Sequence, residues 1–325
     1  MPRLHSHGLL AVLVSLAAPA ALAAQTGATP PPATTPQERI RGSFAPPTRW
    51  RLTATADAFG TAESRFDAGG PGPAPEGARD VRVRRLWARL SSPAWILGGG
   101  RTILTHELTA ERLGIDYGPR AAPTATLAPD DLNLLQSDLV VNQRLSAAWR
   151  LTTLFQAALV TDGANLGTGH LRLTAVSWAS KQVRPNLQWG VGLALVNHTP
   201  RVLPVVRVLW ADGRGHRADV LLPSRAEYWW ELSPRVEVGG ALRVTGNRWT
   251  LGALSARPFE QAVYVQGTVA PAIHWRPSAT LSVIGEAGVA PLRVLRFIDT
   301  EGVAREAAIG PGVSGFLRTT VRTTF

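Results

Sequence analysis

The chain has 325 residues with 34 Lys or Arg against 23 Asp or Glu, a formal net charge of +11, and no Cys. The lack of Cys excludes a disulfide scaffold, a thiolate metal site and a cysteine nucleophile. The arginines stand singly along the chain, which together with the export signal described next argues against nucleic acid as a partner.

The N-terminal residues have the pattern of a secretory signal peptide. Arg3 precedes an apolar run over residues 9–18, and small residues end the segment at Ala24. The apolar run is shorter than the ~20 residues that a helix needs to span a bilayer. Residues 1–24 are therefore predicted to direct export, and the Pro- and Thr-rich residues 25–47 are predicted to form an extended periplasmic tail.

From residue 48 to residue 325, apolar and polar residues alternate along one run after another. Leu187, Trp189 and Val191, for example, alternate with Gln188 and Gly190, so the two faces of the sheet differ in polarity. Several runs reach the ~9 to 11 residues that a tilted strand needs to cross a bilayer, whereas most strands have ~5 or 6. The pattern predicts an all-β fold, a transmembrane antiparallel up-and-down β-barrel.

The number of strands follows from the turns between the runs. The runs are 49–59, 81–90, 95–106, 132–144, 149–161, 170–181, 187–197, 202–211, 217–222, 225–232, 235–246, 262–275, 279–297 and 313–325. Fourteen is an even number, as in bacterial barrels. The hairpin 217–232 has short arms that bend at Pro223, and without it the count is twelve, so 12 to 14 strands are predicted. The longer connections, expected to be extracellular, are 60–80, 107–131, 246–261 and 298–312.

Tryptophans gather beside the short turns. Seven lie within about four residues of such a turn, as expected of an aromatic girdle at the periplasmic membrane interface. They are Trp149, Trp178, Trp189, Trp210, Trp229, Trp230 and Trp275.

The last alternating run ends in an aromatic residue. Phe325 follows Thr323 and Val321 on one face of this run, while Arg322 and Arg318 lie on the other. Such an ending is typical of the signal that the barrel assembly machinery reads. Phe325 is therefore predicted to be the assembly signal.

Turn and strand-end motifs resemble those of a known family. Leu221-Leu222-Pro223 is followed by Glu227-Tyr228 and by Leu232-Ser233-Pro234-Arg235-Val236, and Leu145-Ser146 and Trp149 stand at an earlier turn. These motifs are similar to those of an uncharacterised bacterial outer-membrane β-barrel family catalogued as a domain of unknown function. The resemblance covers residues 80–325. It implies a barrel in the outer membrane and carries no catalytic or binding residue.

Residues that could carry chemistry are scarce. The mature histidines are far apart in sequence and form no ligand pair, and no G-x-S-x-G motif is present. We therefore expect no catalytic, metal-binding or cofactor-binding residue, no cofactor, and a protein that is not an enzyme.

The polar phases of the strands are predicted to line the lumen. Twelve arginines and four carboxylates are expected on these phases, and an excess of positive charge in a water-filled pore favours anions. The candidate lumen residues are Arg150, Arg207, Arg235, Glu237, Arg243, Glu286, Arg318 and Arg322. Alternatively, these arginines pair with carboxylates or lipid phosphates and only stabilise the wall.

Three functions are compatible with this sequence. The first is a passive outer-membrane channel with a basic, anion-favouring lumen, and the second is a closed structural or surface-interaction barrel without transport. A less favoured third is an outer-membrane lipid hydrolase. The expected partners are outer-membrane lipids and lipopolysaccharide, the barrel assembly machinery and small solutes, but not nucleic acid.

Overall fold

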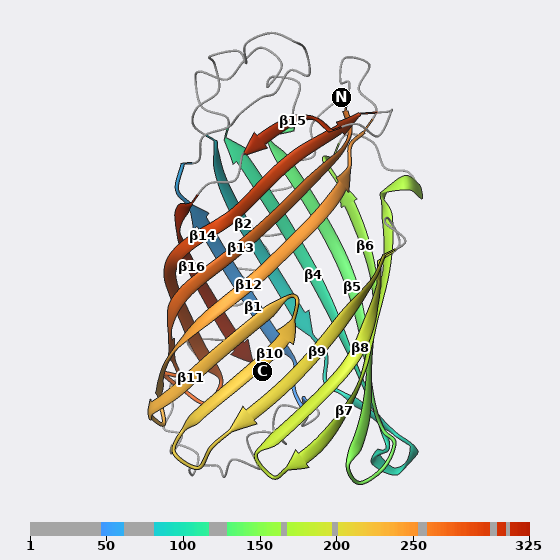
Figure 1. Cartoon of the computed structure of the whole chain (residues 1–325), viewed down its shortest axis with the longest axis vertical. Coiled ribbons are helices and arrows are strands. Elements are labelled where there is room, and N and C mark those ends of the chain that lie inside the picture. Colours follow the sequence, from blue (N-terminus) through green and yellow to red (C-terminus); the bar gives the residue numbers. More distant parts are fainter. Residues whose placement is uncertain are drawn as a thin grey trace.

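The computed structural model describes residues 47–61, 81–116, 129–163, 168–196, 201–252, 259–299, 304–309 and 313–325. The predicted signal peptide and all of the predicted tail except its last residue lie outside these ranges. In the described part of the chain, fourteen antiparallel strands close into a barrel (Figure 1). The predicted all-β up-and-down barrel is confirmed, with the larger of the two strand numbers.

Each strand of the barrel pairs with its neighbours along the chain, and β1 and β16 join its ends. The first seven strands are β1 (Arg51–Phe59), β2 (Arg82–Ser91), β4 (Thr102–Asp116), β5 (Asp131–Arg144), β6 (Trp149–Thr161), β7 (Leu171–Arg184) and β8 (Leu187–Val196). The other seven are β9 (Arg201–Ala211), β10 (His216–Leu222), β11 (Arg225–Ser233), β12 (Val236–Thr250), β13 (Phe259–Trp275), β14 (Leu281–Asp299) and β16 (Ser314–Thr324). Two accessory strands pair at the rims, β3 (Trp95–Leu97) with β4 and β15 (Ala304–Ile309) with β14.

The outer face of the barrel is apolar. Leu193 and Leu195 on β8 and Ile273 on β13 are exposed, whereas the residues that alternate with them, such as Ala194 and His274, are buried inside. An apolar surface that runs around a closed barrel is stable only in contact with lipid. The protein is therefore an outer-membrane β-barrel. No helix in the described ranges is long and apolar enough to cross a membrane.

Five of the seven tryptophans beside the short turns lie on the outer face, in keeping with an interfacial girdle. They are Trp149, Trp189, Trp210, Trp230 and Trp275. Trp178 and Trp229 lie on the inward phases of β7 and β11, so they belong to the lumen and correct the girdle predicted from sequence. Proximity to a turn does not show whether a side chain faces the lipid or the lumen. This is decided by the position of the residue in the alternation along its strand.

The predicted strand 95–106 is two strands. Gly98, Gly99 and Gly100 all have φ between 59° and 86°, a conformation that favours glycine, and they turn the chain from β3 into β4. As a result β4 extends through Thr102–Asp116, into the segment 107–131 that was predicted to be an extracellular loop.

The backbones of β7 and β8 approach each other closely at Gly192. A Cβ atom on Gly192 would lie 2.0 Å from the carbonyl oxygen of Ser177 and 2.5 Å from the Cα atom of Trp178. We expect Gly192→Ala to lower the free energy of unfolding by more than about 2 kcal/mol, because backbone atoms would have to move. Urea unfolding of the folded barrel measures this. Gly285→Ala, where no atom lies within 4 Å of the added Cβ, is the matched control and should unfold like the wild type.

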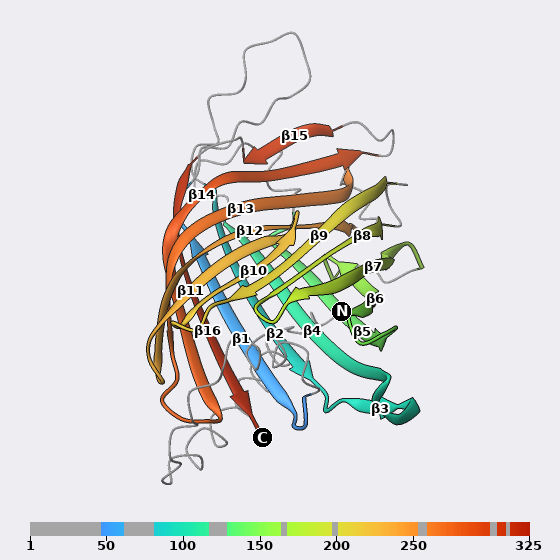
Figure 2. The ribbon, with the colours of Figure 1, turned by 60° about the horizontal axis from the view of Figure 1, so that its bottom comes forward.

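The height of the wall varies around the barrel. β10 and β11 have 7 and 9 residues, whereas β13 and β14 have 17 and 19. Figure 2 shows β13 and β14 curving side by side, with β15 beside β14. The far end of β12 reaches the opposite wall, where Thr250 pairs with Thr161 of β6. The extracellular half of the barrel is therefore narrowed between two walls.

Candidate functional site

A belt of alternating charges follows the inner wall from β4 around to β9. The inward phases of the strands supply five carboxylates and five arginines, and each pairs with one or two members of opposite charge. In order, this charged belt consists of Glu111, Arg85, Asp57, Arg318, Glu286, Arg243, Glu227, Arg225, Asp219 and Arg207.

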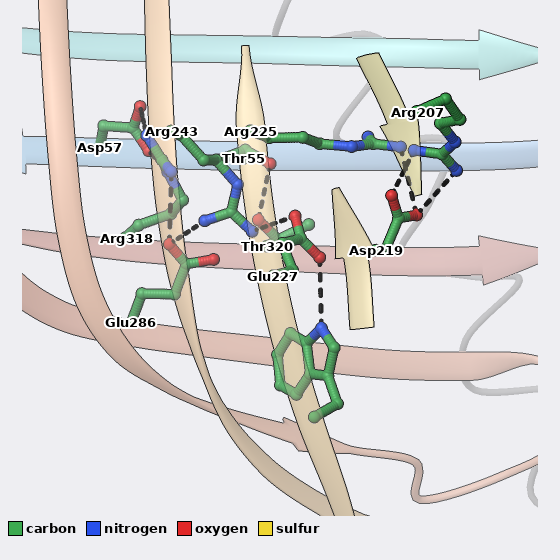
Figure 3. A network of polar contacts seen from close by, with 11 residues as sticks. Thr55, Asp57, Arg207, Asp219, Arg225, Glu227, Arg243, Glu286, Arg318 and Thr320 are labelled. Atoms are coloured by element: carbon green, nitrogen blue, oxygen red, sulfur yellow. Dashed lines mark hydrogen bonds and ion pairs between the residues drawn. The ribbon is translucent and has the colours of Figure 1, made fainter. Parts of the chain in front are cut away.

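Arg318 is the most deeply buried arginine of the belt. Its Nε and Nη2 atoms donate to the two carboxylate oxygens of Asp57 at 2.6 and 3.0 Å, and its Nη1 lies 3.3 Å from Glu286 (Figure 3). The side chains of Arg318 and Asp57 are 6% and 0% exposed. Beside them the hydroxyl groups of Thr55 and Thr320 are 2.8 Å apart. Charges this deeply buried are tolerated because two-pronged hydrogen bonds offset their desolvation.

Arg243 continues the belt toward the shorter side of the wall. It pairs with Glu286 and, at 2.8 Å, with Glu227, which also accepts a hydrogen bond from Trp229 Nε1 (Figure 3). On β10, Asp219 pairs with Arg207 of β9 and with Arg225 of β11. The belt therefore cross-links the wall on both sides of the short hairpin.

A second group of charges lies nearer the periplasmic end. Glu237 accepts from Arg217 at 2.8 Å, from Arg276 at 2.6 Å and from His274 at 2.8 Å. Elsewhere on the inner wall Arg89 pairs with Glu107, and Gln136 and Gln156 donate to Asp138. Among the described residues no three His, Asp or Glu side chains are placed to hold a metal ion.

The predicted lumen residues do not all lie on the inner wall. Arg207, Glu237, Arg243, Glu286 and Arg318 point inward and take part in the ion pairs above, and Arg150 and Arg322 lie on inward phases of β6 and β16. Arg235 does not line the lumen. It is exposed in the turn between β11 and β12, because β12 begins only at Val236.

Four inward carboxylates were missed by the sequence analysis. Glu107 and Glu111 lie in the segment that was predicted to be a loop, and Asp219 and Glu227 belong to the short hairpin. The alternation of Glu107, Thr109 and Glu111 with apolar neighbours was the available signal. Three inward arginines, Arg217, Arg225 and Arg293, were also missing from the sequence count, so the inner wall keeps an excess of positive charge.

In three of the ion pairs, water reaches the arginine more readily than the carboxylate. In the pair Arg217–Glu237 the side chains are 32% and 3% exposed, in Arg225–Asp219 43% and 24%, and in Arg89–Glu107 37% and 20%. The solvated surface of these three pairs is formed mainly by guanidinium groups.

The extracellular half of the lumen is filled by apolar side chains. Opposite walls contribute to this apolar cluster, whose larger members are Phe59, Val83, Leu113, Ile115, Leu132, Leu134, Val160, Trp249, Phe259, Tyr264, Leu295, Phe297 and Phe316. Phe59 stacks on Phe316 with ring centroids 5.8 Å apart. Arg293 is fully buried beside them, where it donates to Gly60 O and Ser314 Oγ. This half of the barrel is packed like a protein core.

Comparisons with known proteins give one family match and several similar barrels. A family described as a domain of unknown function (DUF6268) matches residues 120–301. No curated protein matches the chain in sequence.

Three solved structures illustrate the structural similarity. The COG4313 outer membrane channel from Pseudomonas putida F1 has 13% identity and a TM-score of 0.41 over 86% of this chain and 97% of that one. The P. putida toluene transporter TodX has 10% identity and a TM-score of 0.38 over 90% and 93%. The NanC porin has 8% identity and a TM-score of 0.36 over 84% and 100%.

Proposed function

The chain belongs to the family DUF6268, a domain of unknown function, and we propose that it is a passive outer-membrane channel whose lumen favours small anions. The observation that carries this proposal is the solvent exposure of arginines that point into the barrel. Arg89, Arg217 and Arg225 each keep about a third or more of their side-chain surface exposed. Space for water therefore remains in the lumen, as expected of a barrel wider than the eight-stranded barrels that side chains can fill.

The preference for anions follows from the solvated guanidinium groups. A solute in the lumen meets the exposed edges of the arginines before it meets the buried carboxylates behind them. Rings of exposed arginine favour anions in pores. Because many of the inward arginines are paired with carboxylates, we predict a moderate preference, weaker than the sequence count of arginines implied.

We expect the double variant Arg217→Gln and Arg225→Gln to lose several-fold in anion over cation permeability. Each substitution removes a solvated positive charge, while Arg276 still pairs with Glu237 and Arg207 still pairs with Asp219. The measurement is the reversal potential of purified protein in planar bilayers under a salt gradient. The matched control is Arg82→Gln with Arg84→Gln, two exposed residues on the outer phase of β2. An unchanged reversal potential in the lumen variant would contradict the anion preference.

The second candidate function is a closed structural barrel. The apolar cluster favours it, because this cluster fills the extracellular half of the lumen from both walls. Bilayers that show no conductance above background with correctly folded protein would support the closed barrel and overturn the channel.

A further inference from the structure

The barrel wall is lowest at the β10–β11 hairpin (Figure 1). Seven residues at ~3.3 Å each, tilted by ~45°, rise about 16 Å, less than the ~25 Å apolar band of such barrels. β10 pairs with β9 only along 206–211, and β11 pairs with β12 only as far as Arg243. Beyond the hairpin, no pairing joins β9 to β12 in the described ranges. We call the gap between 201–205, 244–249 and the hairpin the side opening.

The backbone of β9 is adapted to this missing neighbour. Ala211 N–H donates to Asn186 O on the β8 side, so even-numbered residues of β9 turn their backbone groups toward the opening. One of these is Pro204, which has no N–H group. Proline at such a position removes a donor that lipid could not satisfy, and it also makes the edge unsuited to pairing with an added strand. The opening is therefore a stable feature of the wall.

The rim of the side opening is apolar toward the membrane and cationic toward the lumen. Val202 on the outer phase of β9 and Leu222 at the hairpin are exposed around the opening. Arg225 lies on the inner face of the same hairpin, and its partner in register on β12 is Arg243. A molecule crossing this rim passes from apolar contacts to guanidinium groups within the thickness of one wall.

The position of the apolar cluster bears on how a solute could enter the lumen. The cluster narrows the straight path along the barrel axis in the extracellular half, whereas the solvated arginines lie below it and beside the short hairpin.

We propose that the side opening admits small amphipathic anions, an apolar ring or short chain that carries a carboxylate or sulfonate, from the outer leaflet into the lumen. This proposal rests on the proposed channel function. The apolar rim selects solutes that partition into lipid, and the arginines inside select a negative head group.

Closing the opening tests the proposal. We would insert Thr-Val between Val220 and Leu221 and Val-Thr between Arg225 and Ala226, which lengthens both arms and preserves the inward and outward phases. The measurement is efflux of naphthalenesulfonate from liposomes that contain the purified barrel. We expect wild-type efflux well above that of protein-free liposomes and a return to that background in the extended variant. The control carries the same four residues inserted after Arg214, in the opposite turn, and should keep wild-type efflux.

A second variant does not depend on the insertion. Because the chain has no Cys, Leu222→Cys can be labelled selectively with a bulky maleimide, which should obstruct the rim and lower the efflux. Labelled Leu193→Cys, on the outer face of β8, is its control.

The outcomes separate this proposal from the channel function. Wild-type protein without chloride conductance would overturn the channel itself. Chloride conductance together with naphthalenesulfonate efflux that neither Leu222 labelling nor the extended hairpin reduces would overturn only the side opening. Equal efflux of naphthyltrimethylammonium, the cation with the same ring, would overturn the anion class.

Discussion

Replacing Arg318 by Met should lower the free energy of unfolding of the barrel by about 3–5 kcal/mol, the cost of breaking a buried ion pair from one side. The substitution leaves the carboxylate of Asp57, which is fully buried, without its two charge-assisted hydrogen bonds. It also removes one of the two arginines that pair with Glu286. The nearest remaining guanidinium, that of Arg85, lies 3.9 Å from Asp57 and is engaged by Glu111.

Equilibrium unfolding in urea, followed by tryptophan fluorescence, measures this loss. Arg112→Met is the control, because Arg112 pairs with Asp131 on the outer phase and both side chains are partly exposed. An ion pair of that kind contributes at most ~1 kcal/mol. Similar unfolding midpoints for the two variants would show that water or a rearranged partner compensates Asp57, and that the charged belt does not stabilise the wall.

Strand phase could be predicted from the sequence with good accuracy. Alternation placed Leu242 and Val244 outward and Arg243 inward, as the structure has them, because lipid and a polar lumen impose opposite requirements on neighbouring residues. The turns predicted twelve or fourteen strands, and the barrel has fourteen. Alternation failed where it was interrupted, at Gly98–Gly100, since three glycines carry no polarity by which to assign a face.

Partners across the seam between β1 and β16 could not be predicted in the same way. Asp57 and Arg318 are 261 residues apart, and alternation gives the face of each side chain without the register that brings them together. The apolar cluster was hidden for a related reason. Leu113 lies in a segment that was predicted to be a loop, and Leu132 lies on an inward phase that was expected to be polar; only contact with the opposite wall makes an apolar residue stable there.

The side opening could not be predicted from the sequence either, because it depends both on the lengths of the strands and on how the barrel closes. The short arms of the hairpin were visible in the sequence, and Pro204 interrupts a run that otherwise reads as a paired strand. Neither feature predicts a gap alone, because a short hairpin could equally lie outside a twelve-stranded barrel. The continuous pairing of β9, β10, β11 and β12 decides that the hairpin is part of the wall.

Replacing Phe325 by Asp should reduce the amount of folded barrel in the outer membrane severely, while the amount of exported chain stays unchanged. The reason is kinetic, because the structure gives this side chain little role in packing. Phe325 follows β16, its side chain is exposed, and its backbone N–H donates to Trp50 O at 3.0 Å beside the seam where β1 pairs with β16. A backbone hydrogen bond survives the substitution. A loss of folded protein would therefore reflect recognition of the aromatic side chain during assembly.

Heat-dependent migration of the outer-membrane fraction on gels measures the folded amount, and refolding of the purified variant into detergent separates assembly from stability. We expect normal refolding in detergent together with depletion in cells. Val313→Asp is the matched control, because Val313 is exposed just before the other end of β16 and should leave assembly intact. Wild-type levels of folded Phe325→Asp in the outer membrane would show that this residue is not the assembly signal. If the variant also failed to refold in detergent, Phe325 would instead stabilise the closing seam between β1 and β16.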